Sequence, residues 1–125
     1  AHELDMLTCP YVFNEEDARN MAKAGADIIV AHMGLTTKGT IGAETSLSLD
    51  DSVKRVQAIL NAAKEVNPEV LVICHGGPIA YPEDAAYVIE RVDGISGFFG
   101  ASSIERFAAE KGIREQTEEF KKIRK

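Results

Sequence analysis

The fold class of this chain is decided by one stretch, Val70-Leu-Val-Ile-Cys-His-Gly-Gly-Pro-Ile-Ala-Tyr-Pro82. Its first five residues form a continuous apolar run rich in β-branched side chains, which is typical of a strand buried on both faces in a parallel sheet. His75 ends the run, and two glycines and a proline then make a turn. Pro82 and the acids after it open a helix, because proline is tolerated in a first helical turn and acids suit its positive end.

The same strand-then-helix pattern occurs four times along the chain. Strands are expected over 7–13, 26–33, 70–74 and 95–100, and helices over 15–24, 48–66, 82–92 and 104–111, with a last helix over 113–125 beyond a break at Gly112. This alternation predicts an α/β fold with parallel strands and right-handed crossovers. Two architectures fit: four βα units forming the C-terminal half of a (β/α)8 TIM barrel, or a small open doubly wound sheet. In both, ligands bind beyond the carboxyl ends of the strands.

Composition limits the class of protein. The 125 residues suffice for a single domain over 1–125, and the net charge of −6 speaks against a nucleic-acid-binding face. No apolar run approaches the ~20 residues that span a bilayer, so no membrane partner is expected. Cys9 and Cys74 fall inside expected strands, which indicates reduced core thiols in a cytoplasmic protein. Residues 1–6 resemble the last turn of a helix without its beginning, so we expect a fragment of a longer chain.

Each expected strand is followed at its carboxyl end by a polar candidate, in chain order Asn14, His32, His75 and Ser102. Because the carboxyl ends of parallel strands meet at one edge of a sheet, these side chains are expected to lie near one another. Each also has a purely structural explanation. Asn14 and Ser102 are good helix caps, and a histidine can simply end a strand.

Glycines and serines at the same edge predict an anion site, formed by Gly34, Gly76, Gly77, Gly100, Ser102 and Ser103. In TIM barrels a phosphate site often forms from the loops after strands seven and eight and a helix N-terminus, and the third and fourth strands here would be those two. Backbone amides and a serine hydroxyl would then hold a small anionic metabolite. The alternative is that the glycines serve packing and the serines cap a helix.

Three residues are candidates for acid–base chemistry. His32 and His75 titrate near neutral pH, with a reference pKa of ~6.5, and also donate hydrogen bonds to a carbonyl or enolate oxygen. Glu44 lies in the long loop over 35–48, and loops of this length are usually functional or mobile. It is a candidate carboxylate on a closing lid, or an ordinary solvated residue. Lys38 and Arg106 are candidates to offset a phosphate charge.

Four segments together carry a family resemblance: Thr8–Asn14, Ala24–Leu35, Cys74–Pro78 and Gly97–Arg106. They resemble the phosphoenolpyruvate hydrolase-like TIM-barrel family, also described as a signal-transduction domain. The resemblance implies kinship with the isocitrate lyase and phosphoenolpyruvate mutase superfamily, whose members handle small phosphorylated or carboxylated α-keto acids, often with Mg²⁺. The acids that hold the metal there come mostly from the other half of the barrel, so no metal ligand is assigned to this chain.

The resemblance leaves two functions open. One is a hydrolase or lyase domain that binds a small phosphorylated or keto acid at the strand ends. The other is a non-catalytic module for ligand sensing or protein interaction. In either case a lone half-barrel exposes two sheet edges and an apolar face. We therefore expect a homo-oligomer, or pairing with a complementary half-barrel.

Overall fold

The computed structural model describes residues 1–39 and 47–123, so Glu44 lies outside the described residues. Four strands alternate with helices along this part of the chain. The strands are β1 (Tyr11–Val12), β2 (Ile28–His32), β3 (Leu71–His75) and β4 (Gly97–Phe98). The helices are the short 3₁₀ helix η1 (His2–Leu4) and the α-helices α1 (Glu15–Lys23), α2 (Leu49–Val66), α3 (Pro82–Ile89) and α4 (Arg106–Lys121).

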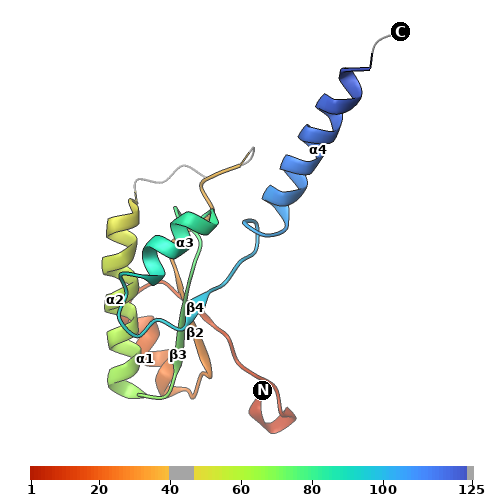
Figure 1. Cartoon of the computed structure of the whole chain (residues 1–125). Coiled ribbons are helices and arrows are strands. Elements are labelled where there is room, and N and C mark those ends of the chain that lie inside the picture. The colour runs from red at the N-terminus through yellow and green to blue at the C-terminus, as the bar shows by residue number, and fades with distance from the viewer. Residues whose placement is uncertain (40–46, 124–125) are drawn as a thin grey trace.

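The four strands form one sheet in the order β1-β2-β3-β4, and every neighbouring pair is parallel. Helices α1, α2 and α3 lie together on one side of this sheet (Figure 1). A doubly wound sheet has helices on both faces and a point where the strand order reverses. Here the order follows the chain and three helices share one face, so the α/β architecture is that of four βα units of half a TIM barrel.

The core lies between the sheet and these helices. Ile29, Ala31 and Val72 point from β2 and β3 into it and have no exposed surface. They meet Val56 and Ile59, which lie on the inward stripe of α2. Burying such aliphatic side chains contributes about 25 cal/mol per Å² of apolar surface removed from water. The helix-facing side of the sheet therefore supplies most of the stability of the fold.

Helix starts follow the local sequence closely at two places. Asn14 Oδ1 accepts a hydrogen bond from the backbone amide of Asp17 at 2.8 Å, and Ser48 Oγ accepts one from Asp51 at 3.1 Å. These are N-caps, each of which typically stabilises a helix by ~1 kcal/mol. After α1, Gly25 has a φ of +87°, the left-handed conformation that ends a helix at low cost in glycine.

Three sequence-based expectations are wrong. Cys9 is exposed rather than part of the core, because β1 begins only at Tyr11, after Pro10, which has no N–H for the ladder. Gly112 does not break the last helix, since α4 runs through it; an isolated glycine costs a helix only about 1 kcal/mol. Ser102 and Ser103 do not cap that helix, because they lie in a turn and α4 starts at Arg106.

Helix α4 stands apart from the other helices. It projects away from the sheet and from α1–α3 (Figure 1), and Phe107 is its one buried residue among those described. None of the described helices is long and apolar enough to cross a membrane.

Candidate functional site

An aromatic cluster lies on the face of the sheet opposite the core, at the carboxyl ends of the strands. Its members are Tyr11, Phe13, His32, His75 and Phe99. The rings of His32 and His75 lie edge to face, with centroids 4.8 Å apart. Tyr11 stacks on His75 at 5.2 Å and contacts His32 at 4.8 Å. Phe13 lies 5.0 Å from His32, and Phe99 lies 5.5 Å from His75, so the phenylalanines flank the histidine pair.

The two-residue period of a β-strand explains why these side chains meet. Val12, Ala31, Cys74 and Phe98 are register partners across the four strands, and all four pack against the core. Successive side chains of a strand point to opposite faces. The next residue of each strand therefore points away from the helices. This brings Phe13, His32, His75 and Phe99 to the same level on the face opposite the core, which we call the open face.

Hydrogen bonds fix the orientation and the tautomer of both histidines. Nδ1 of His32 accepts a hydrogen bond from the backbone amide of Gly34 at 3.0 Å, so the proton of the neutral ring lies on Nε2. Nδ1 of His75 lies 2.7 Å from the carbonyl oxygen of Phe99. A carbonyl oxygen only accepts, so His75 carries its proton on Nδ1. The two rings thus have opposite tautomers.

Their surroundings favour a neutral His32. Burial, and after it the neighbouring His75, lower the pKa of His32 below the ordinary value for histidine. His75 is 8% exposed and His32 is partly buried. A neutral imidazole offers one donor and one acceptor, which suits hydrogen bonding to a carbonyl group or transfer of a proton.

The glycine turns after β2 and β3 pack directly against each other. The amide of Gly77 donates to the carbonyl oxygen of Gly34 at 2.7 Å. Gly76 and Gly77 have φ values of +74° and +60°, and a Cβ atom on Gly77 would lie 2.3 Å from the carbonyl oxygen of Met33. Glycine is thus required by both conformation and space. The structure brings Gly34, Gly76 and Gly77 together, but the Gly77 amide already has a backbone partner.

The two cations suggested for a phosphate are engaged elsewhere. Lys38 Nζ lies 2.7 and 3.0 Å from the two carboxylate oxygens of the buried Asp84. Burial raises the pKa of Asp84, but hydrogen bonds from Lys38 and two backbone amides outweigh it and lower the pKa overall. Arg106 donates to Glu110 at 2.9 Å and to the carbonyl oxygen of Lys38 at 3.0 Å. These contacts tie the segment after β2 to α3 and α4.

The remaining predicted site residues lie at the same end of the sheet without contacting the histidines. Asn14 is occupied as the cap of α1. Gly100 lies against Ile104, whose Cδ1 would be 2.3 Å from a Cβ atom at that position. Ser103 lines a cavity of about 930 Å³ beside Tyr81 and α4. No hydrogen bond between the described residues joins these side chains to His32 or His75.

Sequence reasoning missed the aromatic members of the site, Tyr11, Phe13 and Phe99. The usable signal was their alternation with core residues, since each stands next to a side chain that packs inward. The described residues contain no group of three or more His, Cys, Asp or Glu side chains that could hold a metal ion. Mg²⁺ prefers oxygen ligands, and the described part of this edge offers the histidines no neighbouring carboxylate pair. These residues therefore do not fit a Mg²⁺ site of their own.

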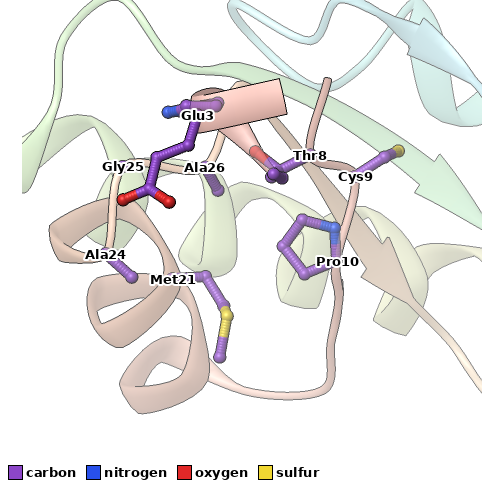
Figure 2. A pocket seen from close by; sticks show the side chains of 10 residues that line it. Glu3, Thr8, Cys9, Pro10, Met21, Ala24, Gly25 and Ala26 are labelled. Atoms are coloured by element: carbon purple, nitrogen blue, oxygen red, sulfur yellow. The ribbon is translucent and has the colours of Figure 1, made fainter. Parts of the chain in front are cut away.

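A second pocket, of about 600 Å³, lies near the amino ends of the strands, between η1, residues 8–10 and the end of α1 (Figure 2). Beside it, Asp27 accepts hydrogen bonds from Thr8 and His2, which hold the pKa of Asp27 well below its usual range. In TIM barrels the amino end of the strands serves stability and the carboxyl end serves catalysis. We therefore place the candidate site at the histidine pair.

The fold defines an α/β domain of the TIM-barrel type, with a candidate site at the carboxyl ends of its strands. The family model described as phosphoenolpyruvate hydrolase-like matches residues 1–123, so the chain belongs to the phosphoenolpyruvate hydrolase-like family. The resemblance read from the sequence and the expected fold class are both confirmed.

Three relatives match nearly the whole chain. The ToMV susceptible protein tm-1(GCR26) and the ToMV resistance protein Tm-1(GCR237), both of Solanum lycopersicum, are each 54% identical over 123 residues. That region is 98% of this chain and 16% of each relative. The y4pA protein of Sinorhizobium fredii (strain NBRC 101917 / NGR234), whose name refers to transcriptional regulation, is 31% identical over 98% of this chain and 20% of its own length. The chain thus spans a fifth or less of these relatives.

Proposed function

We propose that this chain is part of a phosphoenolpyruvate hydrolase-like enzyme domain that binds a small phosphorylated or keto acid at the carboxyl ends of its strands. The observation that carries the proposal is the histidine pair. His32 and His75 contact each other at the edge where TIM-barrel proteins bind ligands, and each ring is held by a backbone hydrogen bond at Nδ1. This leaves Nε2 of each ring as the atom that meets the ligand.

In this proposal His32 polarises a carbonyl group of the acid through Nε2–H, and Nε2 of His75 takes up and returns a proton. Tyr11, Phe13 and Phe99 form the apolar wall around them, and removing water from such a site strengthens every hydrogen bond to the ligand. The charged end of the acid lies toward Gly34, Gly76, Gly100, Ser102 and Ser103. Glu44 is proposed to act from the loop after β2, and Asn14 from the start of α1.

The open face of the sheet requires cover. Parallel sheets are almost always buried on both faces, whereas α1–α3 here lie on one face only (Figure 1). We therefore propose that a complementary half-barrel or a second copy of this chain covers the open face. The free thiols of Cys9 and Cys74 agree with a cytoplasmic location.

A non-catalytic, ligand-sensing module is the second candidate. One observation favours it: Lys38 and Arg106 are paired with Asp84 and Glu110, so neither stands ready to neutralise the charge that develops during phosphoryl or acyl transfer. The name of the y4pA relative, which refers to regulation, points the same way.

Histidine-to-asparagine variants test both candidates, because asparagine keeps a polar atom near the position of Nδ1 while removing Nε2. We expect H32N and H75N to lose turnover of phosphoenolpyruvate or pyruvate, with and without Mg²⁺, while their thermal unfolding stays cooperative. H2N, at the other end of the sheet, is the matched control and should keep full activity. Saturable binding without turnover in the unmodified chain would support the sensor instead. If these acids neither bind nor react, the proposal is wrong.

A further inference from the structure

The histidine pair also indicates which chemical group it recognises. We propose that His32 Nε2–H donates a hydrogen bond to a carbonyl oxygen of the ligand, while His75 Nε2 accepts one from a hydroxyl on the adjacent carbon. The ligand would then present an α-hydroxycarbonyl group to the histidines, rather than a phosphate. This inference rests on the proposed function, because it concerns the same site and narrows the class of acid that it binds.

The argument begins with the two Nδ1 atoms, which are both committed to the backbone. The amide of Gly34 donates to Nδ1 of His32 at 3.0 Å, and Nδ1 of His75 donates to the carbonyl oxygen of Phe99 at 2.7 Å. A neutral imidazole has one N–H and one lone pair. Nε2 is therefore a donor on His32 and an acceptor on His75, and backbone contacts rather than solvent set this difference.

Both Nε2 atoms remain available to a ligand. Among the described residues, neither Nε2 atom has a hydrogen-bond partner. The described residues also contain no fully buried side-chain nitrogen or oxygen atom that lacks a partner, so neither Nε2 is fully buried. Each Nε2 therefore keeps some solvent-accessible surface. The ring centroids are 4.8 Å apart, close enough for one small group to meet both rings.

The charges around the pair disfavour a phosphate dianion at this point. A dianion is held by several donors or by cations, as at glycine-rich loops and arginine forks. Here one of the two Nε2 atoms is an acceptor, which repels another acceptor. Lys38 binds Asp84, Arg106 binds Glu110, and the Gly77 amide donates to Gly34. The lowered pKa of His32 further opposes a doubly protonated, cationic pair.

Nuclear magnetic resonance of the chain labelled with ¹⁵N-histidine tests the proposal at pH 7.5 in the presence of EDTA. Long-range ¹H–¹⁵N spectra report which ring nitrogen carries the proton. We expect His32 protonated on Nε2 and His75 on Nδ1. The probes are hydroxyacetone, which has the proposed group, acetone, which lacks only the hydroxyl, and inorganic phosphate. Hydroxyacetone should shift both rings and bind roughly tenfold tighter than acetone, as one added hydrogen bond allows.

The variant H75N tests whether Nε2 of His75 accepts the hydrogen bond from the hydroxyl group of the ligand. It retains a donor for the Phe99 carbonyl oxygen and loses Nε2, so hydroxyacetone should bind it no tighter than acetone. The proposal is overturned if His75 carries its proton on Nε2, if hydroxyacetone and acetone bind equally, or if phosphate alone saturates the rings. Phosphate saturation would leave the proposed function standing. If none of these probes, nor phosphoenolpyruvate or pyruvate, shifts either ring, the proposed function fails as well.

Discussion

The two faces of the sheet use the same strands for different purposes. On the helix-covered face, Ile29 and Val72 are aliphatic and fully buried. On the open face, the two side chains that flank the buried Val12 of β1 are larger and more exposed: Tyr11 is 44% and Phe13 49% exposed. Alternate residues of one strand thus contribute to the core and to the candidate site separately, because the pleat points them in opposite directions.

Two adjacent isoleucines give the largest effect. Ile29→Ala removes a fully buried side chain from the core, and we expect the free energy of unfolding to fall by about 2–5 kcal/mol. Ile28→Ala, the same chemical change one residue earlier on the open face, should cost less than about 1.5 kcal/mol, because Ile28 is only partly buried. Urea unfolding of both variants measures the difference. Equal losses would mean that the open face is packed as tightly as the core in solution.

The proposed cover on the open face is tested by a charge. Leu71 is 49% exposed at the start of β3, and Leu71→Asp should weaken an assembly that buries this face by about 1–3 kcal/mol. Sedimentation velocity over a range of concentrations would show a shift toward the monomer. Val66→Asp, at the end of α2, is the control and should leave assembly unchanged. An unmodified chain that remains a monomer at every concentration would rule out a second copy as the cover.

His32, on the open face, should make the free energy of unfolding depend on pH. The folded state lowers the pKa of His32, so below about pH 6.5, the unfolded value, the unfolded chain binds more protons than the folded one. The neutral form of His32 therefore contributes its full share to the free energy of unfolding above that pH. This share is lost as the pH falls toward the pKa of His32 in the folded state, at no more than about 1.4 kcal/mol per pH unit. Urea unfolding at pH 7.5 and 5.5 measures the loss. H32N should reduce it, and an identical loss in H32N would assign it to other groups.

The smallest effect concerns α4, which belongs to neither face. Gly112 lies inside this helix with open space around it, so Gly112→Ala should stabilise α4 locally by about 0.5–1 kcal/mol. Amide hydrogen exchange should slow within α4 and stay unchanged in β2 and β3. Slower exchange throughout the sheet would instead mean that α4 and the sheet unfold together.

Most of the architecture could be predicted from the sequence. Continuous apolar runs identified β2 and β3, the apolar stripe identified α2, and Asn14 and Gly25 marked the ends of α1. Each of these signals depends only on residues that are neighbours in the sequence, so it can be recognised without knowing the tertiary structure. The short strands β1 and β4 were overestimated because their ends depend on which neighbour they pair with. Cys9 shows this, since it reads as part of a strand and lies outside the ladder.

The site was predicted only in part, for a related reason. His32 and His75 were identified because each ends an apolar run, whereas Tyr11 and Phe99 join them only through strand register, which one sequence does not display. The tautomers were beyond reach as well, because they depend on the amide of Gly34 and the carbonyl oxygen of Phe99. The ion pair of Lys38 with Asp84 joins residues 46 positions apart, so no local sequence pattern indicates it.

The two cysteines give the chain a chemical reporter of its own folding. Cys9 is exposed, while Cys74 is buried and burial raises the pKa of its thiol to about 11. Since the thiolate is the reactive form, an alkylating reagent at neutral pH modifies Cys9 quickly and reaches Cys74 only when the sheet separates from its helices. The rate of the second modification therefore measures how often the core opens. It does so with the two thiols that the sequence already contains, and Cys74 directly precedes His75 of the candidate site.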